Sequence, residues 1–216
     1  MRALALVVLA SATAHAAPHL GPRGAPIGLP AVGADGIYAA PLEEQDGGSE
    51  SLGRGVQFVR PDGTSDVEMV ITYKESAGSG VWADNAPRVR REVPGRVDRL
   101  NERLAGFETL PRPVLHRDAV SDERHWKVRS GALLLDSNGT RLTVTRDAEV
   151  LVTHMLPTKA DRNPKSCPRH RAWLAAVYVD EAHHALLLHH VYEGGDVCAE
   201  PIDDWVALPL PLPLPR

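Results

Sequence analysis

The residues best able to do chemistry form one cluster near the middle of the chain: His116, Asp118, Asp122 and His125. Imidazole nitrogens and carboxylate oxygens bind divalent metal ions, and the same groups can transfer protons as an acid and a base. The spacing matches no established ligand motif, and the neighbouring Arg117 and Arg124 oppose the binding of a cation. We therefore interpret the cluster as a charged surface loop and keep a divalent-metal enzyme as the alternative.

Four more histidines lie close together later in the chain: His183, His184, His189 and His190. Neighbouring residues of a regular strand point to opposite faces of a sheet, so His189 and His190 cannot bind the same ion. In the hairpin described below, each of these two lies opposite a small residue, Ala176 or Ala175, as large and small side chains pack together. We predict histidines that pack in a sheet or lie in a turn, with a metal site built on one or two of them as the alternative.

Acidic residues gather near the C-terminus at Asp196, Glu200, Asp203 and Asp204. Carboxylate oxygens are the ligands that Ca²⁺ prefers, but no glycine stands where a calcium-binding loop would turn sharply. No motif for a cofactor or a catalytic nucleophile goes beyond a weak match. The sequence therefore predicts no cofactor and no catalytic residue.

Cys167 and Cys198 are the two cysteines of the chain, and they flank the segment that most clearly has the pattern of a hairpin. In an exported protein, two such thiols pair more often than they stay free. We predict one intramolecular disulfide, which closes a loop of about 30 residues and stabilises the fold by roughly 3 to 4 kcal/mol. The spacing differs from the C-x-x-C pattern of a redox-active pair.

That hairpin consists of two strand-like runs, 171–179 and 185–192, joined by a polar turn at 180–184. A two-residue loop between Glu181 and His184 would fix the register. The register then pairs Val179 with Leu186, Val177 with Leu188, Ala175 with His190 and Trp173 with Tyr192. Both faces of the hairpin are apolar, which is typical of central rather than edge strands.

Apolar runs between turn signals predict further strands at 36–40, 56–60, 67–73, 126–129, 132–135, 141–145, 149–153 and 205–208. Turns at 61–64 and 137–139 join four of them into hairpins. We predict a mainly β fold, an antiparallel two-layer sandwich or open barrel with one amphipathic helix packed on it.

The helix is predicted at about 96–106, where Val97, Leu100 and Leu104 recur at helical spacing. Pro94 stands where such a helix can begin, and Gly106 stands where it can end. Arginines and acidic residues alternate over the rest of its surface. We interpret them as a solvated face, with a site for an anion as the alternative.

Residues 1–16 have the pattern of an export signal. Arg2 supplies the positive charge, residues 3–10 are apolar, and Ala14 and Ala16 are the small residues that precede a cleavage site. The apolar run is much shorter than the roughly 20 residues of a membrane-spanning helix. We predict cleavage before Ala17 and a periplasmic or secreted protein without a membrane span.

The rest of the chain is predicted to contain a Pro/Gly-rich lead at 17–31, extended and partly disordered, a single β-rich domain at 32–208 and a Pro-Leu tail at 209–216. The formal net charge of −4 gives no general attraction for nucleic acid. The function that the sequence predicts is a non-enzymatic binding or structural module of the periplasm or cell envelope, whose partner is a protein or another envelope component. The divalent-metal enzyme is the alternative.

Overall fold

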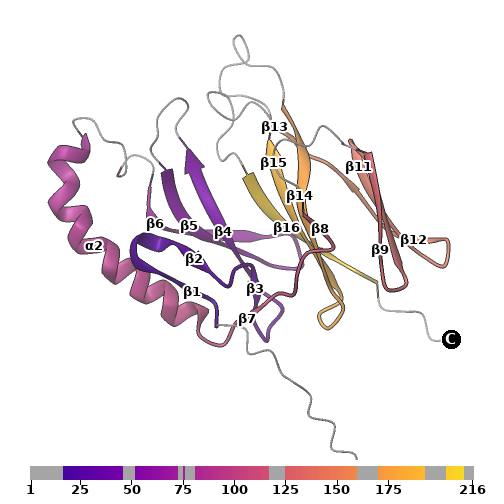
Figure 1. Cartoon of the computed structure of the whole chain (residues 1–216), viewed down its shortest axis with the longest axis horizontal. Coiled ribbons are helices and arrows are strands. Elements are labelled where there is room, and N and C mark those ends of the chain that lie inside the picture. Colours follow the sequence, from indigo (N-terminus) through magenta and orange to yellow (C-terminus); the bar gives the residue numbers. More distant parts are fainter. Residues whose placement is uncertain are drawn as a thin grey trace, which may run out of the picture.

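The structure is a computed structural model, which describes residues 17–45, 52–72, 75, 81–116, 125–159, 170–192 and 203–211. In this part of the chain, one long helix and three antiparallel sheets lie side by side as four layers (Figure 1). We call the sheets, in order from the helix, the first, central and outer sheets. The prediction of a mainly β, antiparallel fold with one helix packed on it is confirmed, and the stack extends to a third sheet.

The first sheet has the strand order β6-β5-β4-β3-β7. Its strands are β3 (Ala31–Val32), β4 (Tyr38–Gln45), β5 (Leu52–Val59), β6 (Ser65–Ile71) and β7 (Glu108–Thr109). β5 and β6 form the predicted hairpin around residues 61–64. β4 runs further into the polar stretch than predicted, because β5 pairs with it along its whole length.

The central sheet has the order β13-β14-β15-β16, and β8 also pairs with β14. Its strands are β8 (Leu115–His116), β13 (Thr158–Lys159), β14 (His170–Asp180), β15 (Ala185–Tyr192) and β16 (Asp203–Pro209). The outer sheet has the order β12-β11-β10-β9. Its strands are β9 (His125–Ser130), β10 (Leu133–Asn138), β11 (Arg141–Arg146) and β12 (Glu149–Met155).

Both faces of the central sheet are buried, and its own apolar side chains pack into the cores on the two sides. Ala185 and Leu187 of β15 lie in one core cluster with the first sheet, whereas Leu186 and Leu188 lie in a second cluster with the outer sheet. Alternate residues of one strand therefore enter two different cores, as the pleat of a β-strand requires. The hairpin β14–β15 occupies the middle of its sheet, as the sequence predicts.

The register of that hairpin is predicted correctly only near its turn. Val179 pairs with Leu186 and Val177 pairs with Leu188, as expected. A register shift between Leu174 and Ala176 then breaks the ladder. Beyond it the prediction is wrong: His190 lies opposite Leu174 rather than Ala175, and Tyr192 lies opposite Ala172 rather than Trp173. An extra residue inserted as a β-bulge moves every later pair by one position.

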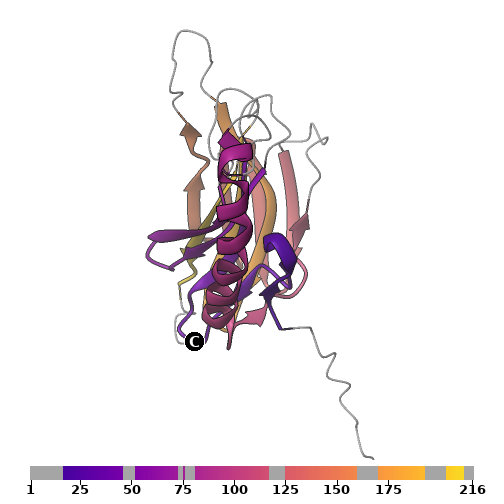
Figure 2. The same ribbon diagram turned by 90° about the vertical axis from the view of Figure 1, so that its left-hand side faces the viewer.

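Helix α2 (Val81–Leu104) covers the first sheet (Figure 2). Leu100 and Leu104 pack against Val56 and Phe58, so the predicted apolar stripe faces the sheet. The prediction that the helix begins near Pro94 is wrong, because α2 continues through this proline to Val81. Pro94 lies on the exposed side of the helix, where water can satisfy the carbonyl that proline leaves without a partner.

The N-terminal lead is packed against α2 rather than partly disordered. β1 (His19–Leu20) pairs with β2 (Pro26–Ile27) around a short 3₁₀ helix, η1 (Pro22–Gly24). Asn101 of α2 accepts a hydrogen bond from the backbone N–H of Leu20 and donates one to its carbonyl. One helix residue thus fixes the lead through both backbone groups.

Residues 1–16, which carry the predicted export signal, lie outside the described residues, as does the tail from residue 212 onward. Cys167 and Cys198 also lie outside them, so the disulfide stays a prediction. Among the described residues, no helix is both long and apolar enough to span a membrane.

Candidate functional site

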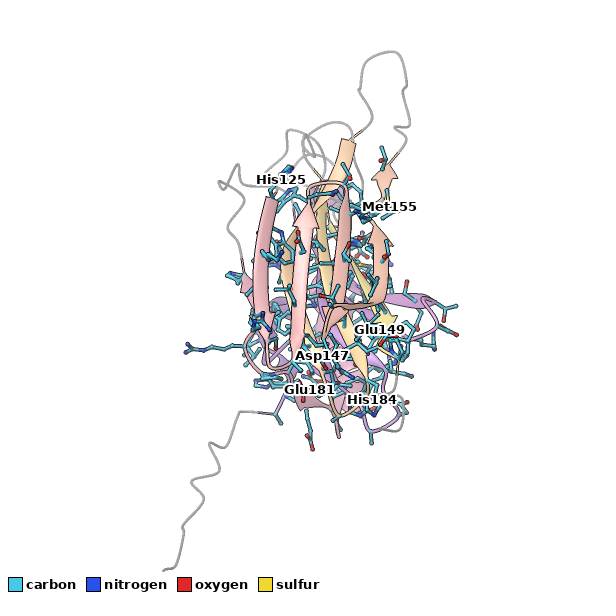
Figure 3. The ribbon with its side chains drawn as sticks, turned by 90° about the vertical axis from the view of Figure 1, so that its right-hand side faces the viewer. His125, Asp147, Glu149, Met155, Glu181 and His184 are labelled. Carbon is cyan, nitrogen blue, oxygen red and sulfur yellow. The ribbon has the colours of Figure 1, made fainter. Side chains whose placement is uncertain are left out.

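The outer sheet turns one face to solvent, and strand pairing arranges its residues in three rows (Figure 3). Across β9, β10, β11 and β12 the rows are Arg129, Leu134, Thr145 and Val150; Lys127, Asp136, Thr143 and Thr153; and His125, Asn138, Arg141 and Met155. We call these residues the outer face. Figure 3 shows His125 and Met155 at the same end of the sheet on its two edge strands, with Glu149 toward the other end.

The outer face contains a shallow hollow of about 290 Å³. Its lining is polar and charged apart from one leucine: Lys127, Leu134, Asp136, Asn138, Arg141, Thr143 and Thr145. This volume is at the lower end of the range for small-molecule pockets, which is about 300 to 1,000 Å³. The hollow is therefore suited to one side chain or a short segment of a partner.

Charge and exposed apolar surface distinguish this face from an ordinary solvated sheet. Lys127 forms an exposed ion pair with Asp136 at 3.1 Å, whereas Arg129 and Arg141 have no acidic partner among the described residues. Val150 and Met155 on the edge strand β12 are 57% and 63% exposed. The face combines unpaired positive charge with apolar side chains that nothing in the described chain covers.

The cluster predicted as a metal site is described only in part. His116 lies on β8 in the central sheet, and His125 is the first residue of β9 in the outer sheet. Asp118 and Asp122 lie outside the described residues. The two histidines thus belong to different layers, and the four-residue site stays a prediction.

Of the acidic residues near the C-terminus, Asp203 and Asp204 begin β16, while Asp196 and Glu200 lie outside the described residues. Each aspartate of β16 holds a histidine of β15. Asp204 accepts a hydrogen bond from His190 Nδ1 at 3.1 Å, and Asp203 lies 2.9 Å from His189 Nε2.

The two pairs lie on opposite faces of the central sheet. His190 contacts the outer sheet, whereas His189 stacks on Trp205, which belongs to the core shared with the first sheet. The expectation that His189 and His190 face opposite ways is therefore confirmed. Among the described residues, no group of three or more histidine, cysteine, aspartate or glutamate side chains could hold a metal ion.

His190 meets a third histidine that comes from the outer sheet. His154, on β12, places its Nε2 atom 3.2 Å from Nε2 of His190. The ring centroids are 5.2 Å apart and the planes differ by only 5°. Because the centroids are much farther apart than the two nitrogens, the rings meet nitrogen to nitrogen rather than face to face.

The surroundings of this pair are buried and hydrogen-bonded. His190 is fully buried, and the second oxygen of Asp204 accepts a hydrogen bond from the hydroxyl of Tyr192 at 3.0 Å. Burial and the neighbouring His190 lower the pKa of His154 to about 4. Burial, with Asp204 beside it, raises the pKa of Tyr192. At neutral pH His154 is therefore an uncharged imidazole.

The other pair is built into the structure of the sheet. The rings of His189 and Trp205 are 4.1 Å apart and nearly parallel, at 3°. Trp205 Nε1 donates a hydrogen bond to the carbonyl of Pro41 in the first sheet. His189 is thus held on both sides, by a carboxylate and by an aromatic ring that anchors two sheets to each other.

Sequence reasoning missed His154. It is a single histidine in a strand of ordinary pattern, and none of the clusters discussed above includes it. Its partner is 36 residues away, and only the stacking of the outer on the central sheet brings the two rings together. The signal that could have found it is the register of β11 with β12, which places His154 beside the buried Leu142.

Comparisons with protein-family models, with curated proteins and with solved structures give no match for this chain.

Proposed function

We propose that this protein is an exported, non-enzymatic binding module that uses the outer face to hold another protein of the cell envelope. The observation that carries the proposal is the composition of that face. It unites a hollow of about 290 Å³, two arginines that have no acidic partner among the described residues, and the exposed apolar side chains of β12.

The chemistry of the face defines the partner segment that would fit. Arg129 and Arg141 favour a segment that presents carboxylates, and Val150 and Met155 favour apolar side chains beside them. The threonines that line the hollow can donate and accept hydrogen bonds. A short acidic and apolar segment of a protein satisfies all three requirements.

Site-specific photo-crosslinking in the organism that makes this protein tests the proposal. A photoreactive residue at Thr153, an exposed position on the outer face, should give a discrete adduct with one envelope protein. The same residue at Arg99, on the exposed side of α2, is the matched control and should not give this adduct. Introducing Arg141→Glu into the Thr153 variant should reduce the yield several-fold, because it reverses a charge beside the hollow.

Equal adducts from Thr153 and Arg99, or no adduct from Thr153 in a folded protein, would contradict the proposal. A circular dichroism spectrum matching the unmodified protein establishes that each variant is folded.

A further inference from the structure

We propose that His154 and His190 together bind one divalent ion of a late transition metal, such as Zn²⁺ or Cu²⁺, between the central and outer sheets. The site is independent of the proposed function, because it lies on the inner side of the outer sheet. The described residues already bring the two ring nitrogens together and hold one of the rings in the tautomer that a metal needs.

The distance between the two nitrogens fits a shared ion. Two nitrogens at the usual zinc distance of about 2.0 to 2.1 Å in a tetrahedral site lie about 3.3 Å from each other. Nε2 of His154 and Nε2 of His190 are 3.2 Å apart, in rings whose planes differ by 5°. The two nitrogens are therefore already at the separation that a shared ion needs, and both rings must turn about their side-chain torsions to aim their lone pairs at the ion.

Asp204 sets the tautomer of His190. An ionised carboxylate can only accept, so the proton of His190 lies on Nδ1, which is 3.1 Å from Asp204. The Nε2 lone pair of His190 is therefore directed at His154. A carboxylate that holds the far nitrogen of a histidine is the usual outer partner of a metal-binding imidazole. Tyr192 fixes the other oxygen of this carboxylate.

The charge of the site also suits a cation. His154 is uncharged at neutral pH, and the carboxylate of Asp204 lies beside His190. In the metal-free protein, Nε2–H of His154 donates to Nε2 of His190. When a metal binds, this proton moves to Nδ1 of His154, which frees the Nε2 lone pair of His154 for the metal.

Two imidazoles leave part of the coordination sphere of the metal open. Among the described residues no third histidine, cysteine or carboxylate completes the group, so water or a further ligand would fill the remaining positions. A late transition metal is favoured because imidazole is a ligand that Zn²⁺ and Cu²⁺ prefer, unlike Ca²⁺ and Mg²⁺.

Metal titration of the purified full-length protein, freed of metal with a chelator, tests the site. Zn²⁺ in competition with a coloured chelator should bind with a stoichiometry of one, and His154→Gln should weaken this binding at least ten-fold. Asp204→Asn should weaken it about ten-fold or more, the range found for outer partners of metal ligands. Bound Cu²⁺ should show hyperfine coupling to imidazole nitrogens by electron paramagnetic resonance, and His154→Gln should reduce this coupling.

His189→Gln is the matched control. It removes a histidine from a hydrogen-bonded aspartate pair on the opposite face of the same strands, and it should leave the metal affinity within two-fold of the original. His154 is chosen for substitution because it is only partly buried, whereas a change at the fully buried His190 could unfold the protein. Circular dichroism verifies folding of every variant.

Three results would each overturn the proposal. The first is the absence of stoichiometric binding at micromolar Zn²⁺ or Cu²⁺. The second is full affinity in folded His154→Gln, which would assign the metal to other histidines. The third is an equal loss of affinity in His189→Gln. None of these results bears on crosslinking at the outer face, so the two proposals fail separately.

Discussion

The carboxylate of Asp180 is buried at the end of β14, and three donors surround it. The hydroxyl of Tyr38 donates to Oδ2 at 3.0 Å, and the ring and backbone nitrogens of His183 donate at 2.8 and 3.1 Å. Burial, with Asp180 alongside, raises the pKa of Tyr38. This network joins the first sheet to the turn of the central hairpin.

Tyr38→Phe should lower the free energy of unfolding by about 1.5 to 3 kcal/mol, the contribution of a hydrogen bond to a charged group. Urea denaturation measures the loss. Tyr178→Phe is the control, because Tyr178 lies in the same core cluster and its hydroxyl has no hydrogen bond among the described residues. It should cost less than about 0.5 kcal/mol. Equal losses in the two variants would show that the bond to Asp180 adds nothing.

Glu75 connects the end of the first sheet to α2 through a two-pronged ion pair. Its two oxygens lie 2.8 and 3.0 Å from the guanidinium nitrogens of Arg96, and the backbone N–H of Thr72 donates to it as well. The hydrogen bond with Arg96 lowers the pKa of Glu75 below its ordinary value. Between the lowered pKa of Glu75 in the folded chain and its ordinary pKa in the unfolded chain, the unfolded chain binds the proton more readily. The free energy of unfolding therefore rises with pH across this interval.

The contribution of Glu75 is therefore fully present above the ordinary glutamate pKa, about 4.3, and is lost as the pH falls through the lower pKa of the folded state. In Glu75→Gln, the free energy of unfolding should be lower at neutral pH and should fall less steeply below about pH 4.3. Urea denaturation from pH 3 to 7 measures both effects. Glu149→Gln, at an exposed position, should keep the original pH dependence.

Glycines show how differently a strand and a helix tolerate one added methyl group. Gly55 lies in β5 at a register shift with β6, and a Cβ atom there would come within 2.5 Å of the carbonyl oxygen of Glu68. Gly95 lies inside α2, where the nearest atom would be Nη1 of Arg99 at 3.9 Å. The first substitution meets the backbone of the next strand, and the second meets only the end of a flexible side chain at ordinary contact distance.

Gly55→Ala should lower the free energy of unfolding by about 1 to 3 kcal/mol, because two strands must separate to admit the methyl group. Gly95→Ala should raise it by about 0.5 to 1 kcal/mol, because alanine loses less backbone entropy in a helix. Thermal and urea denaturation give both changes with opposite signs. A loss of stability in both variants would contradict the account of α2.

The elements that the sequence predicts well are those whose side chains repeat a simple pattern. The apolar run at 185–188 alone predicts a strand buried on both faces, and the structure confirms it. The bulge at Ala175 leaves no such pattern, so the register beyond the pair of Ala176 and His189 could not be predicted. The start of α2 is predicted wrongly near Pro94, because local helix propensity takes no account of the packing of Val89 and the ion pairs of Arg96.

The arrangement of the layers is the part that no local pattern contains. A strand that is apolar on both faces indicates two covering layers, but it does not say which strands supply them. The pair of His154 and His190 exists only because β12 of the outer sheet covers β15 of the central sheet. His190 could be singled out from the sequence, whereas its partner required the assembled molecule.

A buried amide adds a further link between the first and central sheets. Gln57, on β5, donates from Nε2 to the carbonyl of Trp205 at 3.1 Å and accepts from the N–H of Trp205 at 3.0 Å. Trp205 lies on β16, the edge strand of the central sheet. A side chain of the first sheet therefore satisfies backbone groups that an edge strand would otherwise leave open for another chain.

Gln57→Leu keeps the approximate size of the side chain but leaves the N–H and carbonyl of Trp205 buried without partners. Each unsatisfied group costs about 1 to 3 kcal/mol, so the free energy of unfolding should fall by about 2 to 6 kcal/mol. Because the weakened contact lets β16 separate from the first sheet more easily, its edge should also pair with other molecules, which light scattering detects as association that increases with protein concentration. Val67→Thr, at an exposed position of the neighbouring strand β6, is the control and should change neither property. If Gln57→Leu is as stable and as monodisperse as the original protein, the amide is not what closes this edge.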